Sequence, residues 1–333
     1  YNWGDNAAIS PFYWRFRDMG SGKIERTIKF SFHFLNFKHR VNQDPVPEFA
    51  DNPSNLFRGI YVQVLESDQR ARSVSDLMVE TMVNWGVTSV FGMVGHSNLG
   101  LADAIREQEA AGRLTYYGIR HEGAAAFACS GFAKLSGRPA ACLSIAGPGA
   151  TNLLTGLWDA RVDRAPVLAL TGQVNTQVFG PGAFQEIDLA AAFSAVADFS
   201  QTVLPGSRHA ELMTLALKHA NVERSVAHLI FPDEVQQLPA PDGPASGPQG
   251  RLGHSEIAPA KASLEQAAAR IAASRRPAGI VGYGARERMP EVLALAERLH
   301  APVLTTFKAK GQLADDHPLA AGVLGRSGTT VAS

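Results

Sequence analysis

The sequence has few cysteines, no net charge and no long apolar run. Cys129 and Cys142 form neither a CxxC pair nor a zinc-binding spacing, so we expect two buried thiols and no disulfide framework. No stretch approaches the about 20 continuous apolar residues that cross a bilayer, and no signal peptide is visible. The chain contains 31 Lys and Arg residues and 31 Asp and Glu residues, so it has no excess of positive charge. This balance argues against a nucleic-acid-binding surface. We therefore expect a cytoplasmic protein with no nucleic-acid partner and no integral membrane segment.

Hydrophobic residues make up 45% of the chain and recur in a regular order from Ser73 onward. Short apolar runs predict strands, and each is followed by about 12 residues with helical periodicity. Ser73 and Asp76 form a candidate capping box at the start of the first such helix. This order of strands and helices predicts an α/β fold with a parallel sheet covered by helices on both faces.

Composition divides the chain into four parts. Residues 1–70 carry no chemical motif and stay unassigned, although the alternating Phe30, Phe32 and Phe34 suit a half-buried strand. Residues 71–238 form the main α/β domain, and residues 239–256 are a linker rich in Pro and Gly. Residues 257–333 begin a second α/β domain that is truncated.

Four loops at the predicted carboxyl ends of strands are candidates for chemistry, because ligands of α/β sheets bind there. Their sequences are GMVGHSN at 92–98, RHEGAAAFA at 120–128, GPGATN at 147–152 and GAFQEID at 182–188. GPGATN lacks the GK[ST] end of a P-loop, and no GxGxxG fingerprint is present. The loop is therefore either a phosphate cradle at a helix N-terminus or a plain tight turn. A dinucleotide-binding oxidoreductase is disfavoured.

Glu122 is the strongest single candidate for catalysis. It follows a predicted strand and precedes an apolar run of Gly and Ala, where desolvation disfavours a charged carboxyl group. A carboxyl group that shares a proton near neutral pH can act as a general acid or base. The competing interpretation is an ordinary helix N-terminal Glu, favoured by the helix dipole.

Together, these motifs give the segment 73–238 a resemblance to a known domain. RHEGAAAFA, GPGATNLLTGLWDA at 147–160, PVLALTGQV at 166–174 and GAFQEID resemble the pyrimidine-binding domain of thiamine diphosphate enzymes such as acetolactate synthase and pyruvate oxidase. GYGA at 282–285 and HPLAAGVLG at 317–325 resemble the start of that family's central domain. The resemblance implies the thiamine diphosphate-binding fold.

The resemblance also implies roles for particular residues. Glu122 matches the catalytic glutamate that bonds N1′ of the cofactor's aminopyrimidine ring, and Gln185 matches a glutamine that faces the reaction centre. Pro148 and Asn152 match residues beside that ring. Three further positions match: Phe184 as an aromatic neighbour, Gly95 as a loop glycine near the cofactor, and His121 as either an active-site or a structural residue.

The implied activity is decarboxylation of pyruvate or a related 2-keto acid. The acceptor is then a second keto acid or an electron carrier, and Val94 and His96 in GMVGHSN depart from the pattern of acetolactate synthases towards that of pyruvate oxidases. The family assembles its site between the subunits of a homodimer or homotetramer. FAD is a weaker expectation, because GYGA is equally typical of a plain strand-to-helix turn.

The family holds Mg²⁺ and the diphosphate on a GDG motif in a C-terminal domain, and this sequence contains no GDG. We therefore assign no metal ligand to this chain and expect the Mg²⁺ ligands in a further domain. The alternative to an enzyme is a non-catalytic fragment or one half of a split enzyme.

Overall fold

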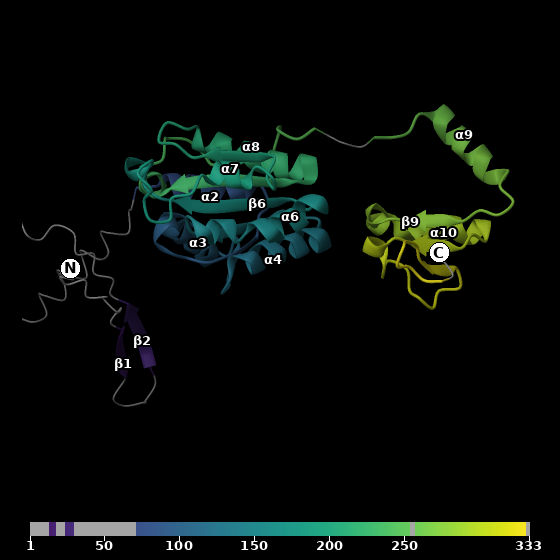
Figure 1. Ribbon diagram of the computed structural model, residues 1–333, viewed down its shortest axis with the longest axis horizontal. Coiled ribbons are helices and arrows are strands. Elements are labelled where there is room, and N and C mark those ends of the chain that lie inside the picture. The colour runs from purple at the N-terminus through teal and green to yellow at the C-terminus, as the bar shows by residue number, and fades with distance from the viewer. Residues whose placement is uncertain (1–12, 18–23, 30–70, 254–256, 331–333) are drawn as a thin grey trace, which may run out of the picture.

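Strands of residues 71–238 form one six-stranded parallel sheet, which confirms the predicted fold class. The computed structural model describes residues 13–17, 24–29, 71–253 and 257–330 (Figure 1). The sheet order is β4-β3-β5-β6-β8-β7, and every neighbouring pair is parallel. The strands are β3 (Ser89–Gly92), β4 (Thr115–Gly118), β5 (Ala140–Ser144), β6 (Val167–Gln173), β7 (Phe199–Thr202) and β8 (Val226–Pro232).

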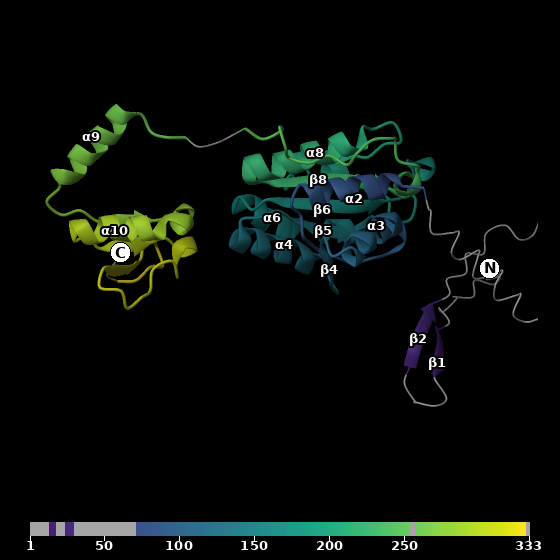
Figure 2. The same ribbon diagram turned by 180° about the vertical axis from the view of Figure 1, so that it is seen from behind.

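Helices cover both faces of this sheet (Figures 1 and 2). One face packs against α2 (Val74–Asn84), α3 (Leu99–Ala110) and α8 (His209–His219). The other face packs against α4 (Glu122–Ser136), α6 (Leu154–Val162) and α7 (Leu189–Phe193), with the single turn α5 (Pro148–Thr151) preceding α6. Alternate residues of β3, β5, β6 and β8 enter the two cores, as expected for strands buried on both sides.

Local sequence signals explain several boundaries. Ser73 and Asp76 form the predicted capping box of α2, with Asp76 N donating to Ser73 Oγ over 3.1 Å and Ser73 N donating to Asp76 Oδ2 over 2.7 Å. Gly86 has φ of +91° just after this helix, a backbone conformation that favours glycine. Gly137 ends α4 in the same way with φ of +71°.

Both cysteines are free and fully buried, as predicted. Cys129 of α4 and Cys142 of β5 belong to the same core. Burial raises the pKa of the Cys129 thiol well above its usual value, and its hydrogen bond with Cys142 adds to this. The Cys129 thiol is therefore held in its neutral form at physiological pH.

The second α/β unit is small. Its sheet has the parallel order β11-β10-β9, built from β9 (Gly279–Val281), β10 (Val303–Thr305) and β11 (Ala320–Val323). A small core joins this sheet to α10 (Met289–Leu299), whereas every residue of α9 (Lys261–Ala272) is exposed. The GYGA turn starts a 3₁₀ helix that ends at Arg288. From this helix, Arg286 Nη1 donates a hydrogen bond to Leu135 O, at the end of α4, over 2.9 Å.

Little of the N-terminal segment is described. β1 (Tyr13–Arg17) and β2 (Ile24–Lys29) pair as an antiparallel hairpin. The strand predicted at Phe30 to Phe34 lies outside the described residues. Among the residues that the structure does describe, no helix is long and apolar enough to cross a membrane.

His228 is buried, and its burial should make the stability of the protein depend on pH. Its ring stacks on Phe193 at 3.8 Å between centroids, and its nitrogens lie 2.8 Å from Thr171 Oγ1 and 2.9 Å from Ser200 Oγ. Burial lowers the pKa of the His228 imidazole to about 3, against about 6.5 in an unfolded chain. The unfolded state therefore binds more protons than the folded state between these values, and stability falls as pH decreases through this window.

We expect the free energy of unfolding to fall by on the order of 1.4 kcal/mol per pH unit below pH 6.5 on account of His228. His228→Gln removes this titration, so its stability should depend less steeply on pH by about that amount. Urea unfolding at pH 7, 6 and 5 measures both slopes. Equal slopes for the two proteins would contradict the prediction.

Candidate functional site

The predicted catalytic carboxyl group lies at the start of α4, just after β4. His121 is the N-cap of this helix, and its Nδ1 accepts a hydrogen bond from Gly123 N over 3.1 Å. Of the two roles predicted for His121, the structure therefore displays a structural hydrogen bond. Glu122 is the first helical residue, and only 7% of its surface is exposed.

Asn152 holds one oxygen of this buried carboxyl group. Its Nδ2 donates to Glu122 Oε2 over 3.0 Å, although 30 residues separate the two in sequence. Among the described residues, none forms a hydrogen bond with Glu122 Oε1. The carboxyl group is thus oriented through one oxygen, and the other oxygen can bond a ligand.

A glycine allows the β5 loop to approach Glu122. A Cβ on Gly149 would lie 3.0 Å from Glu122 Oε1, 3.2 Å from Ser144 Oγ and 2.5 Å from Ile145 Cγ1. Any side chain at position 149 would therefore collide with Ile145 and crowd the free oxygen of Glu122. Gly149 lies inside GPGATN but was not singled out from the sequence, although the second glycine of GPG was the available signal.

Ile145 also contacts the loop that follows β3. A Cβ on Gly95 would lie 2.6 Å from Ile145 Cγ2, so Gly95 needs to be glycine for this contact. Ala146 N donates to Ser97 Oγ over 2.8 Å and ties the two loops together. Sequence reasoning missed Ile145, because an apolar residue at a strand end carries no chemical signal.

The loop that follows β6 brings Gln185 against the same turn. The Cβ of a residue at position 147 would lie 2.7 Å from Gln185 O and 2.8 Å from Gln185 Cβ, and Gly147 has φ of +67°. Gln185 itself has φ of +68°, a conformation that costs a non-glycine residue about 1 kcal/mol or more and often marks functional sites. Phe184 next to it is 87% exposed.

Glu186 fastens this loop, and sequence reasoning missed it. Its carboxylate accepts hydrogen bonds from the backbone N–H groups of Gly180 (2.8 Å), Gly182 (3.1 Å) and Ala183 (2.8 Å). These bonds favour the charged form and hold the pKa of Glu186 below its usual value. An acidic residue that follows several glycines was the available signal.

The predicted residues therefore gather at the carboxyl edge of the sheet. Glu122 and Asn152 are in contact, Gly95 contacts Ile145 beside them, and Gln185 packs on Gly147. Pro148 is exposed at the first position of α5. Among the described residues, no cluster of three or more His, Cys, Asp or Glu side chains is placed to hold a metal ion.

The edge combines features that suit a planar heterocycle with a ring nitrogen. A buried carboxyl group can share a proton with such a nitrogen, and glycines let backbone approach the ring. No described residue forms a hydrogen bond with Glu122 Oε1, which leaves this oxygen available for such a bond. The residues present therefore fit the aminopyrimidine end of thiamine diphosphate.

Comparisons with known proteins point the same way. Residues 72–192 match the family model described as thiamine pyrophosphate enzyme, N-terminal TPP binding domain. Residues 264–333 match the thiamine pyrophosphate enzyme, central domain.

Several curated proteins are similar over most of this chain. A putative thiamine pyrophosphate-containing protein, YdaP of Bacillus subtilis, is 34% identical over 263 residues, which cover 78% of this chain and 44% of that protein. The probable acetolactate synthase large subunit of Methanocaldococcus jannaschii is 36% identical over 275 residues, which cover 78% of this chain and 44% of that protein. The pyruvate oxidase of Lactiplantibacillus plantarum is 33% identical over 253 residues, which cover 75% of this chain and 41% of that enzyme. The chain thus spans less than half the length of these relatives.

Proposed function

The chain belongs to the thiamine pyrophosphate enzymes, and on that premise we propose that it supplies the cofactor-activating half of an enzyme that decarboxylates pyruvate or a related 2-keto acid. Residues 71–238 would be the pyrimidine-binding domain, and residues 257–333 would be part of the central domain. The observation that carries the proposal is the buried Glu122, whose Oε2 is held by Asn152 and whose Oε1 has no partner among the described residues.

Glu122 would hold and transfer a proton at N1′ of the aminopyrimidine ring. Asn152 would keep Oε1 directed at that atom by donating to Oε2. Burial strengthens such a proton-sharing bond, because little water competes for it. When bound, thiamine diphosphate supplies the electron sink that decarboxylation of a 2-keto acid needs.

The neighbouring loops would position the rest of the reactants. Pro148 and Gly95 would border the ring, and Phe184 would add an aromatic contact. Gln185 would face the keto acid, which suits its constrained backbone next to Gly147. After decarboxylation, the product would pass to a second keto acid, as in an acetolactate synthase, or to an electron acceptor, as in a pyruvate oxidase.

Carbon dioxide release from pyruvate tests the proposal. The purified chain is mixed with thiamine diphosphate, Mg²⁺ and the diphosphate-binding domain of a relative, because Mg²⁺ ligands are expected on that domain. Release above that of each component alone supports the proposal, and no release with any such domain or 2-keto acid would overturn it. A flavin absorption band in the purified protein tests the weaker expectation of FAD.

We also propose that two copies of the chain associate through α4 and α6. These helices pack together and carry the exposed apolar side chains of Phe127 (47% exposed), Trp158 (53%) and Val162 (55%). Apolar side chains concentrated on neighbouring helices are typical of protein interfaces. Because α4 begins at Glu122, a partner on this face would lie next to the candidate site.

Trp158→Glu should weaken this association at least about tenfold, because it places a charge in an apolar contact. Sedimentation velocity over a concentration series measures the dissociation constant. Leu264→Glu is the matched control, since Leu264 is 58% exposed on α9. An unchanged constant for Trp158→Glu, or an equal change for both variants, would contradict the proposed interface.

A further inference from the structure

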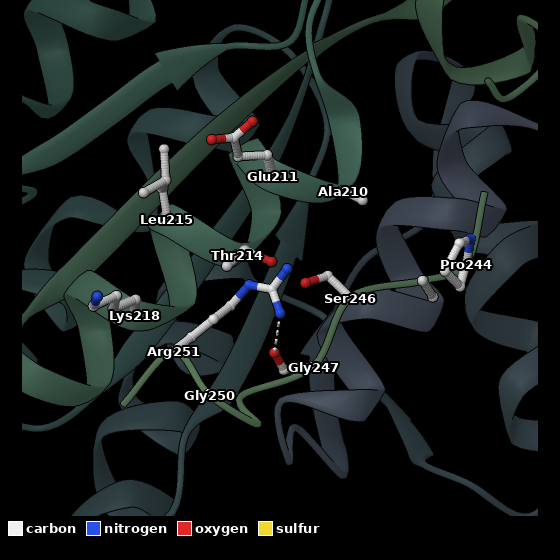
Figure 3. A pocket seen from close by; sticks show the side chains of 11 residues that line it. Ala210, Glu211, Thr214, Leu215, Lys218, Pro244, Ser246, Gly247, Gly250 and Arg251 are labelled. Atoms are coloured by element: carbon white, nitrogen blue, oxygen red, sulfur yellow. Dashed lines mark hydrogen bonds between the residues drawn. The ribbon is translucent and has the colours of Figure 1, made fainter. Parts of the chain in front are cut away.

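A cavity of about 790 Å³ lies between α8 and the linker segment 244–251 (Figure 3). It lies beside the helices of the α2, α3 and α8 face, whereas α4 and Glu122 belong to the opposite face of the sheet. The cavity is therefore separate from the candidate functional site. Its volume falls in the range of about 300–1,000 Å³ that is typical of small-molecule sites.

Hydrogen bonds hold the linker wall of this cavity in place. Ala240 N donates to Arg72 O over 2.8 Å, and Arg72 Nη1 donates to Gly243 O over 2.6 Å. Ser246 N donates to Thr81 Oγ1 of α2 over 3.2 Å. The wall is thus fixed to the first domain at several points, so the cavity is formed before any ligand enters.

Three donors line the cavity, namely the buried Thr214, the half-buried Ser246 and the exposed Arg251. Thr214 of α8 is 5% exposed, and neither its hydroxyl nor that of Ser246 has a hydrogen-bond partner among the described protein groups. Figure 3 shows the guanidinium of Arg251 extended towards these two hydroxyls. Arg251 Nη1 donates to Gly247 O over 3.3 Å, and no carboxylate of the described residues pairs with this guanidinium. Unpartnered buried hydroxyls are costly, so a ligand that accepts their hydrogen bonds would bind favourably.

The rest of the lining combines positive charge with apolar surface. The exposed Lys218 also lines the cavity. Glu211 lies 3.3 Å from Arg208, which offsets the negative charge of Glu211. Leu215 and Pro244 provide apolar walls. This lining matches a ligand with an anionic group on a larger, partly apolar body.

We propose that the cavity binds a phosphorylated small molecule of nucleotide size, with a phosphate group held by Arg251, Thr214 and Ser246. Three separate donors match the three terminal oxygens of a phosphate better than the two oxygens of a carboxylate, and arginine binds phosphate strongly. The cavity is far larger than a phosphate ion, so the remainder of the ligand would lie along Leu215 and Pro244.

Isothermal titration calorimetry on the full chain tests this proposal with ADP as the probe and with adenosine and inorganic phosphate for comparison. We expect one ADP per chain, weaker binding of phosphate alone and no binding of adenosine. Excess thiamine, which carries the aminopyrimidine ring but no phosphate group, should leave the ADP affinity unchanged if ADP enters this cavity and not the candidate functional site. No ADP binding at millimolar concentration, equal binding of adenosine, or loss of ADP binding in excess thiamine would each overturn the proposal.

Substitutions of the lining residues test whether ADP binds in this cavity. Arg251→Gln and the isosteric Thr214→Val should each weaken ADP binding about tenfold or more, because each removes a donor to the phosphate. Thr214→Val should leave the unfolding temperature close to that of the parent, which separates lost binding from lost folding. Arg164→Gln is the charge-matched control, since Arg164 lines a different basic cavity with Arg161 and Arg224. Equal weakening by Arg164→Gln would show non-specific attraction and overturn the assignment.

Discussion

Glu122→Gln should lower carbon dioxide release from pyruvate by at least about 100-fold in the reconstituted assay. Glutamine has nearly the same shape as glutamate, and its amide can still bond Asn152, but it cannot take up or release a proton at N1′. Positioned general acids and bases contribute about 10²- to 10⁴-fold to rates. The rate per chain at saturating pyruvate and cofactor measures the effect.

Glu107→Gln makes the same chemical change on α3, on the other face of the sheet, and should leave the rate unchanged. Circular dichroism and the unfolding temperature check that Glu122→Gln keeps the fold. A Glu122→Gln protein that retains more than half of the parent rate would refute the proposed proton transfer. Such a result would leave the family membership intact, since that rests on the matched sequence.

Much of the sheet could be predicted because parallel strands buried on both faces read as continuous apolar runs. The sequence predicts strands over 140–145 and 167–171. The observed strands Ala140–Ser144 and Val167–Gln173 are fully buried and agree with these ranges to within two residues. Strand β7 was missed, because this short edge strand is only half-buried and carries polar residues. Helix α8 was also missed, although Met213, Ala216 and Leu217 have the spacing of a helical face.

The residue types and the location of the candidate site could be predicted from the sequence, but the contacts within the site could not. An acidic residue at a strand end and glycine-rich loops pointed to the carboxyl edge of the sheet. The Glu122–Asn152 bond joins residues 30 positions apart, and no local pattern specifies such a pair. The family resemblance placed both residues beside the cofactor ring but did not predict this bond. The contacts of Ile145 with Gly95 and Gly149 depend on how two loops pack, which periodicity does not encode.

Packing between α4 and α6 supports this site, and it depends on Gly156. A Cβ at this position would lie 2.6 Å from Ala126 Cβ and 2.7 Å from Phe127 N, so the two helices touch through the glycine. Helix α4 begins at Glu122, and α6 begins two residues after Asn152. The spacing of the helices therefore sets the distance between the two side chains of the site.

Gly156→Ala should lower the free energy of unfolding by about 1–3 kcal/mol, because the added methyl group overpacks the contact and the backbone has to shift. Urea unfolding measures this change. The same shift should lengthen the Glu122–Asn152 bond, so carbon dioxide release in the reconstituted assay should fall as well.

Gly131→Ala is the matched control, because Gly131 lies within α4 and a Cβ there would meet nothing within 4 Å. Alanine is the better helix former by about 0.5–1 kcal/mol, so this variant should be as stable as the parent or more stable. The two Gly→Ala substitutions should therefore change stability in opposite directions. A Gly156→Ala protein as stable as the Gly131→Ala protein would contradict the predicted overpacking between α4 and α6, and an unchanged rate of carbon dioxide release would contradict its effect on Glu122.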